Sequence, residues 1–97
     1  MPTYTWLEGP LRRIRDPFWE AADEKVRMLL DGTLDMIEAD PYSPGMPCWP
    51  YKRGNLHNAY VARRGGRLWV VYQVFRDYPV LGLVAILDDR PPESPPE

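Results

Sequence analysis

The feature that most constrains the fold is a predicted β-hairpin in the second half of the chain. A glycine pair, Gly65-Gly66, separates two runs rich in β-branched and aromatic residues, Leu56 to Arg64 and Arg67 to Phe75. Glycines supply the positive φ angles that a tight hairpin turn requires. A third run, Val80 to Leu87, follows a second turn at residues 76–79. The sequence therefore predicts three consecutive strands.

The middle predicted strand is apolar on both faces. Alternate residues of a strand point to opposite sides, so one face carries Leu68, Val70, Tyr72 and Val74, and the other carries Arg67, Trp69, Val71, Gln73 and Phe75. This pattern favours a central strand covered on one side by a helix. It also predicts a cation, Arg67, beside the stacking surface of Trp69.

The first half of the chain predicts a short strand followed by helices. Thr3 to Leu7 is rich in strand formers, and residues 10–15 indicate a short helical turn. Asp16-Pro17 is typical of a helix start, because the carboxylate accepts from free amides and proline fits the first position. Apolar residues at steps of three or four then predict an amphipathic helix over residues 17–39, with a kink or split allowed at Gly32.

Prolines at every third position mark residues 41–50, which is the period of a polyproline II helix. One interpretation is a ligand for an aromatic-groove domain. The simpler one is an ordered connection packed on the core by Tyr42, Met46 and Trp49.

Charge is segregated along the chain, although the net charge is only −2. Residues 51–76 contain six cations and no acid: Lys52, Arg53, Arg63, Arg64, Arg67 and Arg76. Residues 16–40 contain eight acids against Lys25 and Arg27. We therefore expect an acidic helical part and a basic sheet, a candidate surface for RNA or DNA phosphate. The alternative is a solvated hairpin tip that keeps a sheet edge soluble.

Few other residues point to chemistry. His57 is the only histidine, and Cys48 is the only cysteine, so an internal disulfide and a cysteine zinc cluster are excluded. No phosphate loop, dinucleotide fingerprint or nucleophile elbow is present. No apolar run is long enough for a membrane span, which predicts a soluble, cytoplasmic protein. We expect one domain, residues 1–90, and a disordered Pro/Glu tail, residues 91–97.

The order of parts resembles the RelE/ParE superfamily of type II toxins. The matching text is Gly54-Asn55-Leu56, then Ala59 to Arg64, then Arg67 to Val74, and a last strand closed by Arg90. The resemblance covers roughly residues 4–90. It implies an α+β, RelE-like fold in which a short N-terminal strand and helices pack on a three- to four-stranded, mostly antiparallel sheet.

In the ribonuclease branch, the resemblance implies a ribosome-dependent endoribonuclease that cuts messenger RNA without a metal or other cofactor. A 2′-hydroxyl attacks the neighbouring phosphate, which requires a proton acceptor, cations for the phosphorane and an acid for the leaving oxygen. Arg90 corresponds to the phosphate-stabilising arginine, and Arg63 or Arg64 to the basic strand. The expected partners are a cognate antitoxin and the ribosome with its mRNA, with no membrane.

The chain departs from the family at two places. The arginine three residues before Tyr72 is replaced by Trp69, which leaves Arg67 as the nearest substitute. The family's acid/base residue after the closing arginine is absent. His57 and Tyr60 are the nearby residues that could take over proton transfer. We therefore expect Arg67, Arg90 and His57 as catalytic residues, and the following as RNA-binding residues: Lys52, Arg53, Arg63, Arg64 and Trp69. A non-catalytic or gyrase-inhibiting relative is the alternative.

Overall fold

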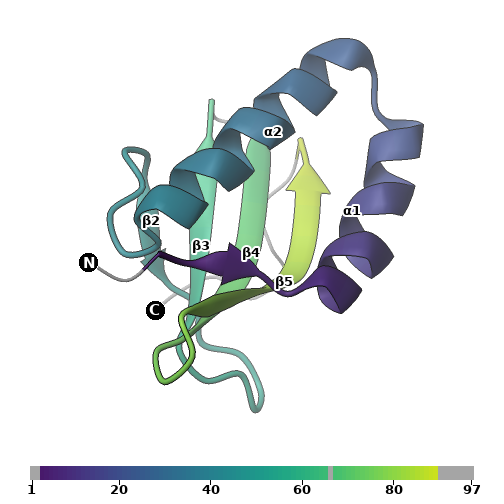
Figure 1. Cartoon of the computed structure of the whole chain (residues 1–97). Coiled ribbons are helices and arrows are strands. Elements are labelled where there is room, and N and C mark those ends of the chain that lie inside the picture. Colours follow the sequence, from purple (N-terminus) through teal and green to yellow (C-terminus); the bar gives the residue numbers. More distant parts are fainter. Residues whose placement is uncertain (1–2, 66, 90–97) are drawn as a thin grey trace.

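The computed structural model describes residues 3–65 and 67–89, and in these residues it is an α+β fold with a five-stranded sheet. The strands are β1 (Thr5–Trp6), β2 (Cys48–Pro50), β3 (Ala59–Arg64), β4 (Leu68–Phe75) and β5 (Val80–Asp88). Their order is β1-β5-β4-β3-β2, with β1 parallel to β5 and the other pairs antiparallel (Figure 1). The predicted strand count was too low because β2 is only three residues long and ends in a proline, which weakens its strand signal.

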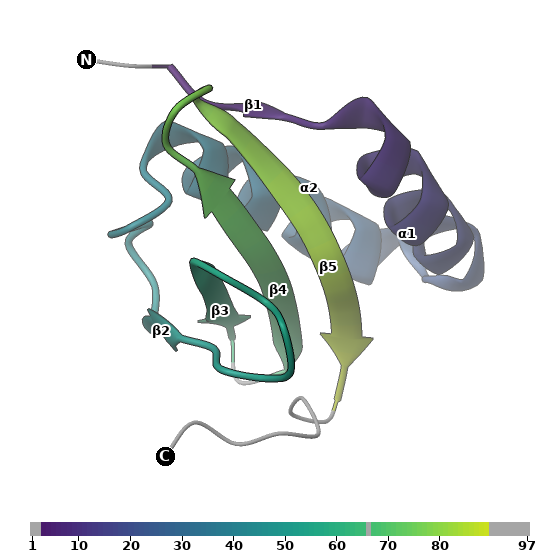
Figure 2. The same cartoon turned by 90° about the horizontal axis from the view of Figure 1, so that it is seen from below.

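Two helices, α1 (Glu8–Ala21) and α2 (Glu24–Ala39), follow β1. α2 runs across one face of the sheet, and α1 lies beside β5 (Figures 1 and 2). This arrangement leaves the other face of the sheet without a helix. We call the two sides the helix-covered face and the open face.

The predicted helix break at Asp16-Pro17 was wrong, because α1 continues through Pro17 to Ala21. Proline removes one backbone hydrogen bond from a helix interior. Leu11, Ile14 and Phe18 lie at helical spacing on both sides of this point and pack against the core. Their burial outweighs the lost bond, so the local preference of proline does not decide where the helix ends.

The actual break is at residues 22–23. Asp23 caps α2, since its carboxylate accepts a hydrogen bond from the amide of Val26 at 2.9 Å. The helix then continues through Gly32 and ends at Ala39, where the predicted stop at Asp40-Pro41 is confirmed.

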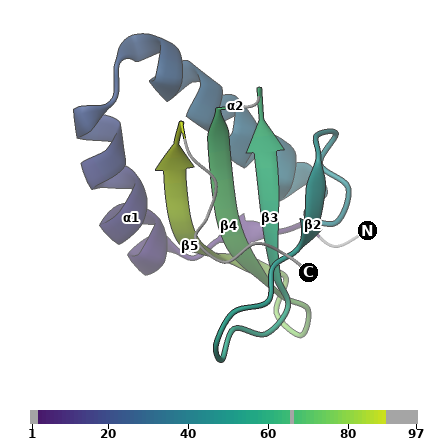
Figure 3. The ribbon, with the colours of Figure 1, turned by 180° about the vertical axis from the view of Figure 1, so that it is seen from behind.

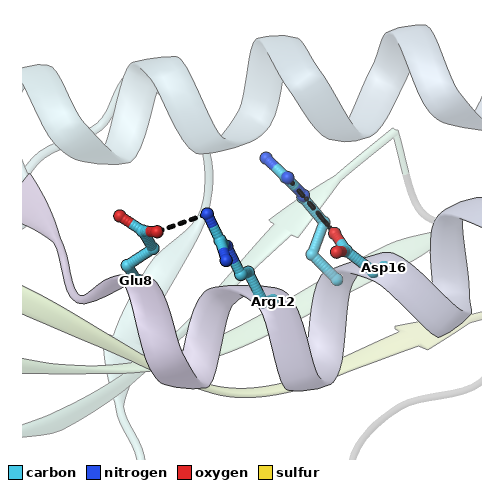
Figure 4. Close-up of polar contacts among 4 residues, drawn as sticks. Glu8, Arg12 and Asp16 are labelled. Atoms are coloured by element: carbon cyan, nitrogen blue, oxygen red, sulfur yellow. Dashed lines mark hydrogen bonds and ion pairs between the residues drawn. The ribbon is translucent and has the colours of Figure 1, made fainter.

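Two exposed ion pairs lie on α1, Glu8 with Arg12 one turn later and Arg15 with Asp16, and in Figure 4 they project from α1 toward the side of α2. Exposed pairs of this kind contribute at most about 1 kcal/mol each.

Within the described residues, no helix combines the length and the hydropathy that a membrane crossing requires.

The main core lies between the helices and the helix-covered face. Leu30, Leu34 and Ile37 of α2 are buried against the sheet. The sheet residues of this core are Ala62, Leu68, Val70, Tyr72, Val74, Leu81 and Leu83. A second, smaller cluster contains Tyr51, Ala59, Val61 and Val71 and lies on the open face, as strand alternation requires.

A β-bulge changes the register where β4 meets β5. Val71 pairs with Ala85 and Tyr72 pairs with Leu83, so Val84 has no partner on β4. A bulge adds one residue to one strand and shifts its side chains relative to the neighbouring strand. Val84 and Ala85 consequently both pack against the open-face cluster.

The proline-rich connection is packed on the molecule. Pro41 and Pro44 are buried, and the hydroxyl of Tyr72 donates a hydrogen bond of 2.6 Å to the carbonyl of Pro41. This is the ordered connection that the sequence favoured. A proline-rich ligand would need exposed prolines, and two of the four are covered.

Candidate nucleic-acid interface

The open face is the side of the sheet that neither helix covers (Figure 3). From β2 to β5 it presents Trp49, Val61, Val71 and Ala85, all in the second apolar cluster. The only segment folded over it in the described part of the chain is the connection between β2 and β3, residues 51–58.

Hydrogen bonds to backbone carbonyls hold this connection, which we call the 51–58 loop, against the sheet. The amide of Tyr51 donates to the carbonyl of Ala59 at 2.8 Å, and the side chain of Gln73 donates to the carbonyl of His57 at 3.1 Å. Gly54 and Asn58 adopt positive φ angles of 57° and 54°. Glycine and asparagine tolerate this conformation better than other residues, so the sequence itself permits the loop to turn back over β4.

A cavity of about 390 Å³ lies where the 51–58 loop meets the open face. Its lining consists of Tyr51, Arg53, Leu56, Val71, Val84, Ala85 and Leu87. Arg53 brings a guanidinium to a site whose other walls are apolar or aromatic. The cavity size is within the range of small-ligand sites.

Arg63 and Trp69 lie beside each other on the same face. They are directly opposite in the β3–β4 register, and Trp69 packs against the open-face cluster. Opposite residues of an antiparallel pair point to the same side, so Arg63 also projects from the open face, where it is exposed. The open face thus presents two arginines and a half-buried indole.

The indole of Trp49 adds a polar group to this region. Its Nε1 atom is buried and has no hydrogen-bond acceptor among the described residues. An unpaired buried donor costs about 1 to 3 kcal/mol.

Solved structures share this arrangement of elements. The YoeB/ParE toxin from Agrobacterium tumefaciens matches with a TM-score of 0.65 at 15% identity, over 92% of this chain and 100% of that chain. The isolated E. coli RelE toxin matches with a TM-score of 0.61 at 18% identity, over 96% of this chain and 89% of that chain. The chain has the RelE-like fold.

The archaeal RelE–RelB complex from Pyrococcus horikoshii OT3 is a further match, with a TM-score of 0.64 at 13% identity, over 89% of this chain and 92% of that chain. By sequence, no protein-family model and no curated protein matches. The fold resemblance inferred from Gly54-Asn55-Leu56 and from Tyr72-Gln73-Val74 is therefore confirmed at the level of structure.

Within this RelE-like fold, Arg67 does not lie beside Trp69, contrary to the expectation from alternation. Arg64 pairs with Leu68, so Arg67 belongs to the turn and not to β4. Its guanidinium donates to both carboxylate oxygens of Asp88, at 2.7 and 3.2 Å, and these bonds raise the pKa of Arg67. Arg67 lines a groove with α2 instead.

The other expected site residues occupy several places. Lys52 and His57 are exposed on the 51–58 loop, next to Arg53. Arg64 points away from the open face and donates to the sulfur of Met36 on α2 at 3.1 Å. Arg90 lies outside the described residues, as do the boundary at residue 90 and the tail 91–97.

The six cations of residues 51–76 consequently do not share one surface. Arg76 lies at the far end of β4, where its guanidinium sits 5.6 Å from the centre of the Tyr42 ring. The prediction of a single basic sheet face was wrong, because neighbouring residues such as Arg63 and Arg64 project to opposite sides of a strand.

Two further groups do not belong to the open face. Tyr60 stacks on Tyr72 in the helix-covered core, with ring centroids 6.1 Å apart, so it is not positioned to act with His57. Burial raises the pKa of the Cys48 thiol, which contacts the Tyr72 hydroxyl at 3.2 Å. A protonated thiol is a poor nucleophile, so Cys48 is better suited to packing than to nucleophilic chemistry.

Sequence analysis missed Tyr51 and Leu56 as site residues. Both line the open-face cavity because the 51–58 loop folds back, which periodicity cannot predict.

Within residues 3–65 and 67–89, no three metal-ligating side chains of His, Cys, Asp or Glu lie together.

Proposed function

We propose that this protein is the toxin of a type II toxin–antitoxin system and that it cleaves messenger RNA on the ribosome. Two lines support the proposal. The fold is shared with the E. coli RelE toxin and the A. tumefaciens YoeB/ParE toxin. The open face combines cations with an aromatic ring, the pair of features that single-stranded RNA binding uses.

The observation that carries the proposal is the position of Arg53 and Arg63. They come from the 51–58 loop and from β3, and both project to the open face that also holds Trp69. An arginine fork can bind two phosphate oxygens at once, and an indole can stack on a base. The two groups together suit a backbone phosphate and its neighbouring base.

The proposed chemistry is attack of a ribose 2′-hydroxyl on the adjacent phosphate. The P–O bond to the 2′-oxygen forms, the bond to the 5′-oxygen breaks, and a proton moves from the first oxygen to the second. Arg53 and Arg63 would stabilise the extra negative charge of the phosphorane. His57, exposed on the same loop as Arg53, would carry the proton.

Arg90 remains proposed as a further phosphate-binding arginine, since it closes the last strand in the resemblance. Arg67 has no role in this proposal, because its guanidinium is bonded to Asp88 on the other side of the sheet. An mRNA-cleaving activity would place the protein in the cytoplasm.

The test is induced expression in a bacterium, with growth and transcript ends as readouts. We expect growth arrest and cuts within codons for the natural chain, and loss of both for the double variant Arg53→Ala/Arg63→Ala. The matched control is Arg64→Ala/Arg67→Ala, which also removes two arginines but none from the open face. Equal loss of activity in the two double variants would show that the open face is not the site.

A non-catalytic protein, such as a gyrase inhibitor, is the second candidate. It is favoured by the position of Tyr60, which leaves His57 without the second proton-transfer group that the sequence suggested. Growth arrest with intact transcripts and a DNA-damage response would support this alternative.

We also propose a cognate antitoxin as partner. The P. horikoshii RelE match was solved as a complex with RelB, and a RelBE2 toxin–antitoxin complex from Mycobacterium tuberculosis matches with a TM-score of 0.61 at 15% identity, over 91% of this chain and 90% of that chain. The measurement is growth rescue and co-purification when the small open reading frame beside this gene is co-expressed.

A further inference from the structure

The open face carries a row of three side chains that ends on β5. Arg63 on β3 lies opposite Trp69 on β4, and Trp69 lies opposite Leu87 on β5. Residues opposite each other in antiparallel strands point to the same side of the sheet, so all three belong to the open face. Leu87 also lines the open-face cavity. The chain therefore leaves the sheet beside the proposed RNA site.

The last described residue, Asp89, marks the place where the chain leaves β5. Its amide donates to the carbonyl of Arg67 at 2.7 Å, and its φ angle is 67°. Few residues other than glycine adopt this conformation, and an extended strand does not continue through it. Residues 90–97, which we call the 90–97 segment, are therefore attached to the sheet close to Leu87.

The 90–97 segment reads Arg-Pro-Pro-Glu-Ser-Pro-Pro-Glu and lies outside the described residues. Four of these eight residues are prolines and two are glutamates, Glu93 and Glu97. Proline restricts the backbone before binding, so little conformational entropy is lost when a proline-rich segment binds. Grooves lined with aromatic side chains are a common binding site for such segments.

The open face has the two features that this composition requires. Tyr51 and Trp69 supply aromatic rings. Arg63 is exposed and makes no ion pair within the described residues, and Arg53 brings a second guanidinium to the cavity. Residues 51–76 contain no acid, so a carboxylate at this face must come from another part of the chain or from another molecule.

The 90–97 segment is long enough to cross the open face. Eight residues in an extended polyproline II conformation span about 25 Å, at about 3.1 Å per residue. Neighbouring strands lie about 4.8 Å apart, so the distance from β5 to β2 is about 14 Å. Arg63 is two strands away from β5, and Glu93 follows Asp89 by four residues, so the reach is sufficient.

We infer that the 90–97 segment binds to the open face of its own chain and competes there with RNA. Its prolines would pack on Trp69 and Tyr51. Its glutamates would face Arg63 and Arg53, which the proposed function assigns to RNA phosphate. Exposed ion pairs contribute at most about 1 kcal/mol each, so the segment is a weak inhibitor that RNA can displace.

The covalent connection favours this occupant over a second copy of the chain. A segment on a short linker has an effective concentration in the millimolar range, well above ordinary protein concentrations. The docking does not depend on RNA cleavage, whereas the competition rests on the proposed function. The two parts therefore need separate measurements.

The docking test uses the full chain with the changes Cys48→Ala and Ser94→Cys and with a nitroxide label on the new thiol. Because Cys48 is the only natural cysteine, the label attaches at residue 94 alone. A nitroxide broadens the NMR signals of nearby protons. The readout is the intensity of the four indole N–H signals in the absence of RNA, and the unlabelled variant provides the reference for correct folding.

We expect the signals of Trp69 and Trp49, which belong to the open-face cluster, to lose more intensity than that of Trp19. Trp19 is on α1, which lies beside β5, so it reports a segment that stays near its attachment point without docking (Figure 2). Adding Glu93→Gln/Glu97→Gln should remove the difference. Equal losses at Trp49 and Trp19 would overturn the inference. Losses that grow with protein concentration would also overturn it, because the segment would then bind a second copy.

The competition test measures binding of a poly-uridine oligonucleotide by fluorescence anisotropy. Glu93→Gln/Glu97→Gln should strengthen RNA binding by about three- to tenfold, because two competing ion pairs are lost. The matched control is Glu20→Gln/Glu24→Gln, which removes the same charge from the exposed surface of the helices and should leave the affinity nearly unchanged. Equal affinities of the two double variants would overturn the competition. Docking without any RNA binding would support the docking and remove the proposed function.

Discussion

The two faces of the sheet are built from the same strands, yet they are covered by different elements. On the helix-covered face, Leu30, Ile37 and Val70 are fully buried. On the open face, the 51–58 loop is the only segment among residues 3–65 and 67–89 that covers the strand cluster, and Trp69 and Leu56 stay partly accessible. The first face packs as the main core, whereas the second, although Val61 and Val71 are buried, keeps partly accessible side chains and is the surface that we propose for binding.

This difference suggests how a chain of 97 residues could combine stability with the site that we propose. Folding depends mainly on the face where helices exclude water, since burial of apolar area is the principal stabilising term. The open face is then available for side chains that suit a ligand.

The largest expected effect is a cavity in the helix-covered core. Leu30→Ala should lower the free energy of unfolding by about 2 to 5 kcal/mol, because its side chain is fully buried between α2 and the sheet. The matched variant on the open face, Leu56→Ala, should cost about 1 kcal/mol or less. Urea unfolding of both variants measures the difference, and equal losses would contradict the division between the faces.

A smaller effect is expected from Tyr72, whose phenol is buried and bonded to Pro41. Tyr72→Phe leaves the Pro41 carbonyl without this donor and should cost about 1 to 3 kcal/mol at neutral pH. Burial raises the pKa of Tyr72 above its ordinary value of 10.0. A raised pKa in the folded state favours the protonated form there, so its stabilisation is present below pH 10 and is lost as the pH rises further.

The pH dependence separates this group from other ionisations. Each unit above pH about 10 should lower the free energy of unfolding by up to about 1.4 kcal/mol in the natural chain, and Tyr72→Phe should reduce this slope. Burial also raises the pKa of the Cys48 thiol, which contacts the Tyr72 hydroxyl, so Cys48→Ala and the double variant with Tyr72→Phe are needed to separate the two ionisations. An unchanged slope in the variant would show that Tyr72 ionises freely.

The cap of α2 should contribute about 1 kcal/mol. Asp23→Ala removes the carboxylate that accepts from the Val26 amide, and Asp16→Ala is the matched change at the helix start that the sequence suggested. We expect the first variant to lower the midpoint of thermal unfolding and the second to leave it nearly unchanged. The reverse order would favour a helix break at residue 16.

The smallest effect concerns two arginines of the hairpin. Arg67→Ala removes an ion pair with Asp88 in which the two side chains are 46% and 29% exposed, so its cost should be about 1 kcal/mol or less. Arg63→Ala should change stability by no more than about 0.5 kcal/mol, because Arg63 is exposed and makes no ion pair within the described residues. Denaturant midpoints of the two variants test whether only Arg67 is structural.

Much of the fold followed from local patterns in the sequence. The strands at residues 59–64, 68–75 and 80–88 fall within one to three residues of the predicted runs, because alternation and the Gly65 turn are local signals. The helix break predicted at Pro17 was wrong. Burial of Leu11, Ile14 and Phe18 outweighs the backbone hydrogen bond that proline removes. The three-residue strand β2 has too short a pattern to be detected.

The site was harder to predict, because the positions of charged residues along the chain do not determine on which side of the molecule their side chains lie. Arg63, Arg64 and Arg67 lie within five positions, but strand alternation and a three-residue turn send them to different sides. The contribution of Arg53 depends on how the 51–58 loop folds back over β4. That path is set by tertiary contacts such as the bond from Gln73 to the His57 carbonyl.

The most direct test of the central claim uses the four tryptophans as reporters of the two faces. Trp49 and Trp69 belong to the open-face cluster, and Trp6 and Trp19 pack against the helix-covered core. In a titration with single-stranded RNA followed by ¹H–¹⁵N NMR, we expect the indole N–H signals of Trp49 and Trp69 to shift while those of Trp6 and Trp19 stay in place. Shifts confined to Trp6 and Trp19 would contradict the assignment of the open face as the RNA-binding surface.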